Sequence, residues 1–312
     1  MAITSRKIVI IKKPTRLDQL VARFNSIQQV KFYIEHIDGN FEDYESEHSA
    51  YQNSLEIVIR NIEKVARIHI IDWMQLTNYQ FNTDDVIATI GQDGLVVNAL
   101  KYLNDQYVVG FNSDKNRWDG SLAQFDPSEA GTIIEMCLQG TVKTKQITKG
   151  VVNLSDNQKL YAVNDFFIGV SNHSSARYQI SYRKKNEMHS SSGVLVSTPL
   201  GRSAWMKSVI TGANGIMNRI QNKESKLVEK REEDWSNDYL YFAVREPFPS
   251  VSSDNSLVFG KINDKDDFFI ESKMGENGII FSDGIQSDYL GFNYSVKAKF
   301  GIAENKGRIV IR

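Results

Sequence analysis

The stretch Asp85–Leu95, Asp-Val-Ile-Ala-Thr-Ile-Gly-Gln-Asp-Gly-Leu, decides the fold of the first half of the chain. An acidic turn leads into a short apolar run that ends at Gly91, and residues 95–103 then suit a helix. This order predicts a strand, a tight glycine turn and a helix. The turn places the Asp93 carboxylate at the edge where open α/β sheets bind ligands and where N–H groups favour phosphate. The alternative is an ordinary turn in which Asp93 only caps the helix.

Strands and helices are predicted to alternate around that stretch. Apolar runs at 7–13, 66–71 and 107–112 predict strands, and apolar residues at helical spacing predict helices over 17–24, 51–62 and 128–138. The polar, acidic segment 39–47 predicts a solvated loop. Strands that alternate with helices predict a doubly wound parallel sheet, so residues 1–150 are expected to form an α/β domain.

The pattern changes from about residue 151. Many short strands separated by glycine, asparagine and aspartate turns predict a β-sandwich-like domain over 151–312. Helical pieces are expected near 201–210 and 216–230, and the last residues, 308–312, form a further strand able to pack back on the first domain. The expected strands of this half are 159–163, 165–170, 178–182, 193–197, 239–244, 256–259, 268–270, 278–281 and 294–298.

Composition excludes several classes of protein. The chain has 312 residues, of which 41% are hydrophobic and 24% charged, as expected for a soluble globular protein of two domains. A net charge of -1 gives no electrostatic case for nucleic acid or an anionic membrane, and no run approaches transmembrane length. The single cysteine, Cys137, cannot form an internal disulfide and is expected to be a buried thiol. These features predict a cytoplasmic protein.

Five segments in the same order resemble motifs of the NAD kinase family. Gly91–Gly94 looks like its GGDGT motif, and Gly110–Asp114 is similar to its GVN strand end. Ala162–Asp165 resembles its Asn-Glu motif, Ser192–Trp205 its GDGVIVSTPTGSTAY segment, and Phe281–Gly284 a late Asp-Gly turn. Segments 13–16, 112–122, 174–177 and 244–247 resemble the mitochondrial-type branch of that family. The resemblance covers nearly the whole chain and implies the same two-domain fold with an active site between the halves.

The resemblance implies phosphoryl transfer from ATP to the adenosine 2′-hydroxyl of NAD, which gives NADP. Asp93 would be the general base for that hydroxyl, and Gly91 and Gly94 would let the backbone approach phosphate. Mg²⁺ is implied together with ATP, because phosphoryl transfer depends on charge neutralisation. No metal is expected on protein ligands alone, since five histidines without paired spacing make a zinc site improbable.

The resemblance also implies a set of binding residues. Asn164 and Asp165 would hold the ribose and adenine of NAD, and Trp205 would stack on a flat ring. Read without the family, Asn164-Asp165 is a plain turn, Trp205 a core aromatic and Arg202 a surface residue. The expected partners are small-molecule nucleotides and further copies of the chain, as a homodimer or homotetramer. The nucleotide-binding candidates are Gly91, Gly94, Asn112, Asn164, Asp165, Thr198, Ser203, Ala204 and Trp205, and the candidate phosphate contacts are Lys13, Arg16 and Arg202.

Several positions depart from the family pattern. Gln92 stands where the motif has a glycine, and Leu95 where it has a threonine. Ser192 replaces an aspartate, and Leu200 and Arg202 replace a threonine and a serine. Three readings stay open: an active NAD kinase with an unusual donor site, a divergent nucleotide binder with weak or no kinase activity, and a kinase of another hydroxyl compound such as a sugar or lipid. The donor, ATP or polyphosphate, and the choice between NAD and NADH also stay open.

Overall fold

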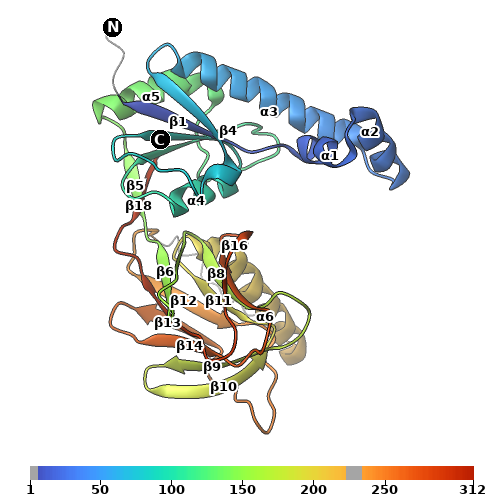
Figure 1. The fold of residues 1–312 in the computed structure, drawn as a ribbon, viewed down its shortest axis with the longest axis vertical. Helices are drawn as coiled ribbons and strands as arrows, with labels where there is room; N and C mark the ends of the chain where they lie inside the picture. The colour runs from blue at the N-terminus through green and yellow to red at the C-terminus, as the bar shows by residue number, and fades with distance from the viewer. Residues whose placement is uncertain (1–5, 223–233) are drawn as a thin grey trace. The chain divides into compact units, whose positions relative to one another are not determined.

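The computed structural model describes residues 6–222 and 234–312 and divides into two compact units. The α/β unit consists of the described residues of Met1–Lys145 together with Arg308–Arg312, and the β unit is Gln146–Gly307. Figure 1 shows the elements of both, and each unit is described by itself.

A six-stranded sheet forms the centre of the α/β unit, in the order β2-β1-β3-β4-β18-β5. Its central strands pair in parallel, and β3 is buried along its whole length because helices cover both faces. From β1 the chain goes outward to β2 and then returns past β1 to β3, so the sheet has a topological switch point between β1 and β3. The strands are β1 (Lys7–Lys12), β2 (Arg67–Asp72), β3 (Val86–Gly91), β4 (Tyr107–Asn112), β5 (Thr144–Ile147) and β18 (Gly307–Val310).

Helices cover the two faces of this sheet. α3 (Phe41–Ile62) and α5 (Ala130–Gln139) pack on the face that carries Ile8, Val86 and Val109. α4 (Asp93–Lys101) packs on the opposite face, where Val96 lies against Gly110. Short 3-10 turns occur at Trp73–Gln75 and Pro127–Glu129. The predicted doubly wound α/β architecture is confirmed, and Cys137 is buried on α5, as expected.

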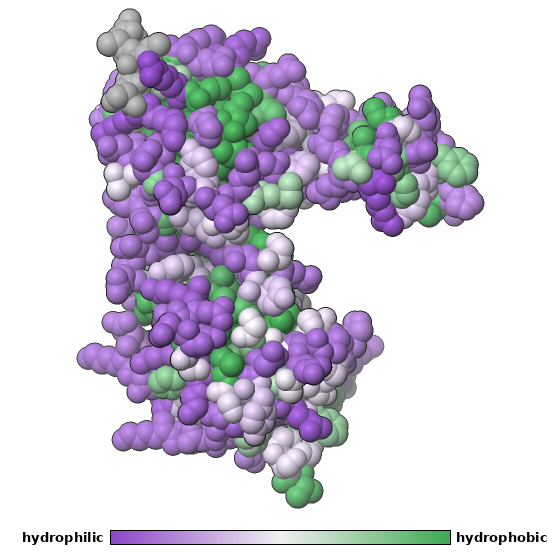
Figure 2. Space-filling model, in the orientation of Figure 1, coloured by the Kyte–Doolittle hydropathy of each residue, from purple (hydrophilic) through white to green (hydrophobic). Residues whose placement is uncertain are grey.

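Two further helices form an arm beside the sheet. α1 (Arg16–Phe24) begins at a capping box of Thr15 and Asp18. α2 (Ile27–His36), which was not predicted, packs against it around Val30. Figure 1 shows both helices beyond the start of α3, and Figure 2 shows apolar side chains on the surface of this arm.

The predicted solvated loop over 39–47 is wrong from Phe41 onward, because α3 begins there. The side chain of Asn40 accepts the N–H of Glu42, and Phe41 is buried. Of the acidic residues that suggested a loop, Glu42 and Asp43 occupy the first turn of α3, where the positive end of the helix dipole favours carboxylates.

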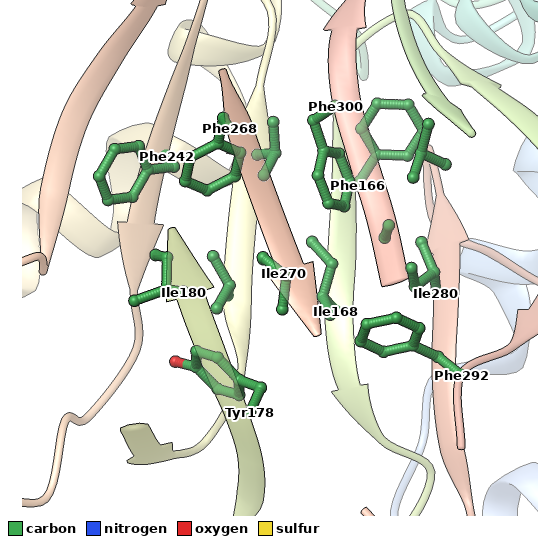
Figure 3. Packing of buried hydrophobic residues seen from close by; sticks show 14 of the residues in the cluster. Phe166, Ile168, Tyr178, Ile180, Phe242, Phe268, Ile270, Ile280, Phe292 and Phe300 are labelled. Atoms are coloured by element: carbon green, nitrogen blue, oxygen red, sulfur yellow. The ribbon is translucent and has the colours of Figure 1, made fainter. Parts of the chain in front are cut away.

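Two antiparallel six-stranded sheets make up the β unit, in the orders β10-β9-β14-β17-β6-β7 and β13-β12-β11-β8-β15-β16. Their inner faces form one apolar core, part of which Figure 3 shows, with Phe166, Phe242, Phe268 and Phe300 in mutual contact. The expected β-sandwich-like architecture is confirmed. The strands are β6 (Gly150–Leu154), β7 (Lys159–Ala162), β8 (Asp165–Val170), β9 (Ala176–Tyr182), β10 (Lys185–Ser191), β11 (Val194–Ser197), β12 (Tyr239–Val244), β13 (Phe259–Asn263), β14 (Phe268–Ser272), β15 (Gly278–Ser282), β16 (Ile285–Gly291) and β17 (Lys297–Ile302).

One helix accompanies the described part of the β unit. After a 3-10 turn at Gly201–Ser203, α6 (Trp205–Gln221) packs on β11 and β12 through Met206. The two helical pieces expected near 201–210 and 216–230 are thus one helix as far as Gln221, and residues 223–230 of that prediction lie outside the described residues. Within residues 6–222 and 234–312, no helix combines the length and apolarity needed to cross a membrane.

Candidate functional site

A cavity of about 150 Å³ lies at the carboxyl edge of the α/β sheet. Three strand ends supply its walls, and α3 adds Glu47 and Tyr51. Two of these strand ends, those of β1 and β3, flank the topological switch point, where α/β sheets of this kind bind ligands. The strand-end residues are Lys13, Pro14, Thr15 and Arg16 after β1, Gly91, Gln92, Gly94 and Leu95 at β3, and Ser113 and Asp114 after β4.

Asp93 is the first residue of α4, and its carboxylate is held by backbone N–H groups. Oδ2 accepts from Ser121 at 3.0 Å, and Oδ1 accepts from Leu122 and Ala123 at 2.9 Å each. The side chain is therefore bound to the loop that follows β4, and Asp93 is not among the residues that line the cavity. Of the two glycines beside it, Gly91 has a φ of +134°, whereas Gly94 lies in the helix.

The altered motif positions line the cavity. Gln92 is the exposed N-cap residue of α4, and its side chain makes no capping hydrogen bond. Leu95 is only 3% exposed and packs as a core residue. The start of α4 thus faces the cavity without a side-chain cap, and such a helix start attracts anions.

The predicted nucleotide-binding residue Asn112 organises the loop after β4. Its Nδ2 donates to the carbonyl oxygen of Trp118 at 2.9 Å, and its Oδ1 accepts the N–H of Asp114 at 3.0 Å. The side chain is buried. Asn112 therefore shapes the loop that holds Asp93.

Both basic candidates after β1 line the cavity. The backbone N–H of Lys13 donates to Tyr51 Oη at 3.0 Å, and its Nζ lies 5.1 Å from the centroid of the Trp73 ring. Arg16 pairs with Asp43 and Glu47 of α3. The phenol of Tyr51 is buried, and this burial raises its pKa to about 12, so it is a neutral donor and acceptor at ordinary pH.

Asp43 also pairs with a second arginine. Arg117, from the loop after β4, places Nη1 2.7 Å from Asp43 Oδ1, and its Nε lies 3.5 Å from Asp114 Oδ2. The hydrogen bonds from Arg16 and then Arg117 hold the pKa of Asp43 below its usual value. Carboxylates of the chain thus pair with both Arg16 and Arg117.

In the β unit, three of the segments that carry the family resemblance meet. The Asp283 carboxylate accepts the N–H groups of Val163 at 2.9 Å, Asn164 at 2.7 Å and Asp165 at 3.3 Å. The N–H of Thr198 donates to the carbonyl oxygen of Asn164 at 2.9 Å. Asp283 and Thr198 therefore fix the Asn164-Asp165 turn from two sides.

Gly201 completes this arrangement. A Cβ at Gly201 would lie 1.9 Å from the carbonyl oxygen of Asn164, so only glycine fits. The N–H of Gly201 donates to Thr198 Oγ1 at 3.1 Å, and that hydroxyl donates to the carbonyl oxygen of Val163. Thr198, a predicted ligand residue, is buried and holds the turn through these bonds.

The two turn residues differ in their surroundings. Asn164 is half-buried, and its side-chain amide has no hydrogen-bond partner among the described residues. Asp165 is only 5% exposed, and burial together with the nearby Asp283 carboxylate raises its pKa to about 8. Near neutral pH, Asp165 is therefore largely protonated and able to donate a hydrogen bond as well as accept one.

The remaining candidates lie at the start of α6. Trp205 is half-buried and stacks on Phe167 at 5.6 Å, with the Arg245 guanidinium 5.3 Å from its ring. Ser203 donates from Oγ to the carbonyl oxygen of Leu200, and Ala204 adjoins Trp205 at the helix start. Arg202 lies over Tyr241. Trp205 is thus part of a small core and also retains an exposed surface.

Sequence reasoning missed two functional candidates. In the sequence alone, Asp283 is part of a late Asp-Gly turn and has no assigned role. Arg117 and its partner Asp43 carried no local signal, because they are distant in the sequence. No cluster of three or more metal-ligating side chains occurs among the residues that the structure describes.

Comparison with known proteins identifies the fold. No family model matches the sequence, and no curated protein sequence matches it. Among solved structures, an NAD kinase from Archaeoglobus fulgidus in complex with ATP is 11% identical, with a TM-score of 0.56 over 98% of this chain and 93% of that one. Yeast NADH kinase complexed with NADH is 15% identical, with a TM-score of 0.59 over 98% of this chain and 83% of that one. The chain is similar in fold to these two kinases.

Proposed function

We propose that this chain is an NAD kinase that transfers a phosphoryl group from ATP or polyphosphate to the adenosine 2′-hydroxyl of NAD. The observation that carries the proposal is a fixed carboxylate, Asp93, beside a cation-lined cavity at the switch point of the sheet. Of the two solved structures with this fold, the archaeal NAD kinase is in complex with ATP and the yeast NADH kinase with NADH, which supports the same ligand classes here.

The donor's phosphates fit the cavity of the α/β unit. Lys13, Arg16 and the uncapped start of α4 supply positive charge, and Gln92 adds an amide donor. Phosphoryl transfer depends on positioning and charge neutralisation, which such donors provide. In this proposal, these groups replace the phosphate contacts that the glycine and threonine of the family motif would make at positions 92 and 95.

In this proposal, Asp93 accepts the proton of the acceptor hydroxyl. A carboxylate has about four lone-pair sites, and backbone N–H groups take three of those on Asp93. The fourth, on Oδ2, remains for the ribose hydroxyl. As the hydroxyl proton moves to Oδ2, the ribose oxygen bonds to the terminal phosphorus, and the bond from that phosphorus to the bridging oxygen breaks. ADP, or shortened polyphosphate, then leaves.

The acceptor is assigned to the residues of the β unit. Asn164 offers an unengaged amide, and Asp165 offers a carboxyl group to the hydroxyls of a ribose. Trp205, already stacked on Phe167, provides an aromatic face for a flat ring. By resemblance, we also propose that the chain acts as a homodimer or homotetramer.

Mg²⁺ fits this proposal as a companion of the nucleotide. The described residues hold no protein cage for a metal, and Mg²⁺ on nucleotide phosphates usually needs only one or two carboxylates. Asp114, on the cavity wall, is the carboxylate that would assist. When bound, the ion would neutralise phosphate charge.

A second function, nucleotide binding without phosphoryl transfer, is favoured by the state of the altered motif. Three N–H groups already occupy most of the Asp93 carboxylate, and Gln92 and Leu95 replace motif residues. This arrangement suits a protein that binds a nucleotide without phosphorylating it. A kinase of a sugar or lipid has no specific observation in its favour.

The test is NADP formation by purified protein supplied with NAD, Mg²⁺ and either ATP or polyphosphate. Asp93→Asn should lower kcat by about 10²–10⁴-fold with little change in KM, because it removes a base and keeps the size of the side chain. Asp105→Asn, an exposed aspartate at the other edge of the sheet, is the matched control and should leave the rate unchanged.

The outcomes separate the two functions. No NADP with either donor, combined with saturable NAD binding, would establish the non-catalytic function. A KM that rises while kcat holds would show that Asp93 only anchors the loop.

A further inference from the structure

Arg16, which lines the cavity, shares the carboxylate of Asp43 with a second arginine, Arg117. Asp43 lies in the first turn of α3, Arg16 in the first turn of α1, and Arg117 in the loop after β4. Asp43 Oδ2 is 2.7 Å from Arg16 Nη2, and Asp43 Oδ1 is 2.7 Å from Arg117 Nη1. Three elements distant in the sequence therefore meet on one carboxylate.

This geometry matches the recognition of a phosphate. Two guanidinium groups that each bind one oxygen of a small planar or tetrahedral anion form a standard phosphate clamp. Arg16 lines the cavity, and so do Glu47 and Asp114, the other partners of Arg16 and Arg117. The clamp therefore adjoins the space assigned to the donor.

We propose that Asp43 occupies, in the absence of ligand, a phosphate site formed by Arg16 and Arg117, and that the polyphosphate chain of the donor displaces it. This inference rests on the proposed function for the identity of the ligand. It makes Arg117 a donor-binding residue and Asp43 an internal competitor.

Displacement is physically reasonable because the bridge is exposed. The side chains of Arg16 and Asp43 are 44% and 39% exposed, and ion pairs at such sites contribute little to stability. A phosphate group carries more charge than a carboxylate and offers three oxygens to the same guanidinium groups. The donor thus replaces one weak contact, that of Asp43, on two arginines that keep their other partners, Glu47 and Asp114.

The competition has a consequence for the loop after β4. The same loop carries Arg117 and the three N–H groups that bind Asp93. A donor that holds Arg117 would therefore keep this loop ordered, together with its contact to the base. Donor binding and the position of Asp93 are coupled through one segment.

The test measures binding of inorganic tripolyphosphate to the full-length protein by isothermal titration calorimetry, without NAD or turnover. Asp43→Asn should tighten binding by about two- to five-fold, since it removes the competitor. Arg117→Ala should weaken binding by about ten-fold, and Arg117→Lys should restore part of that loss because it keeps the charge.

The matched controls come from a similar ion pair in the β unit. Arg183 forms two hydrogen bonds with Asp266 and lines no part of the cavity. Arg183→Ala and Asp266→Asn should leave tripolyphosphate affinity unchanged. Circular dichroism of each variant shows that it is folded before its binding is compared.

The outcomes distinguish this inference from the proposed function. Failure of tripolyphosphate to bind, unchanged affinity in Arg117→Ala, or no tightening in Asp43→Asn would each overturn the inference, even if NADP is formed. The full pattern of affinities without NADP formation would support the phosphate clamp and reject the kinase.

Discussion

Two aspartate side chains of this protein each hold a backbone segment through hydrogen bonds. Asp93 and Asp283 each accept a run of three successive backbone N–H groups, from 121–123 and from 163–165. The local sequence singled out Asp93 because it sits in a glycine turn after an apolar strand. It could not show the partners of either carboxylate, since those lie about 30 and 120 residues away along the chain.

Asp165 should make stability depend on pH. Its pKa rises from 3.8 to about 8 on folding, so the folded state retains a proton that the unfolded state releases. The contribution of Asp165 to the free energy of unfolding is therefore fully present below pH 3.8. It decreases above that pH and is lost once the pH has risen through about 8. Asp165→Asn should therefore gain stability relative to wild type between pH 5 and pH 9, by about 1–3 kcal/mol. Urea unfolding at both pH values measures the difference, and an equal offset at both would contradict it.

Gly201 should tolerate no side chain. In Gly201→Ala the new Cβ would meet the carbonyl oxygen of Asn164, so the turn must move and stability should fall by about 1–3 kcal/mol or more. Gly212→Ala is the matched control, because that position on α6 is exposed and open, and alanine there should be neutral or stabilising by about 0.5–1 kcal/mol. Thermal unfolding compares them. Equal melting temperatures for the two variants would show that the turn is pliable.

At the scale of elements, the strongly apolar segments were predictable and the polar ones were not. β1, β3 and β4 are buried apolar runs, which the sequence shows directly. β10, Lys-Asn-Glu-Met-His-Ser-Ser, has little strand character and forms because it pairs along its length with β9. α2 and residues 41–50 of α3 escaped prediction because their small core is shared among three helices.

The contribution of the Asn40 N-cap of α3 to stability should be measurable. Asn40→Ala removes the acceptor for the N–H of Glu42 and should lower the free energy of unfolding by about 1 kcal/mol. Asn40→Ser keeps a capping oxygen and should lose little. Urea unfolding gives both values. Because Asp43 lies in the first turn of this helix, Asn40→Ala should also loosen the Arg16 and Arg117 bridge, which hydrogen exchange of 113–118 would detect.

At the scale of the whole molecule, the two halves were predictable but the assembly of each candidate site was not. The sequence shows the order of the motifs along the chain but not which of them are in contact. Asn164, Thr198 and Asp283 meet because β8, β11 and β15 are neighbours in one sheet. Likewise, Arg16, Asp43 and Arg117 meet only because α1, α3 and the loop after β4 converge. Such convergence comes from tertiary packing, which no local pattern encodes.

The return of the chain to the first sheet leads to a test of whether the two units unfold separately. β18 lies between β4 and β5 in the sheet order, and Ile309 is fully buried there. Ile309→Ala leaves a cavity and should destabilise the α/β unit by about 2–5 kcal/mol. Since β18 is part of that unit, hydrogen exchange should accelerate in β3 and β4 and stay unchanged in β9 and β14. Arg312→Ala, at an exposed position, is the control and should alter neither. Equal acceleration in both sets of strands would show that the chain unfolds as one cooperative body, so that the two units mark a division of contacts but not of stability.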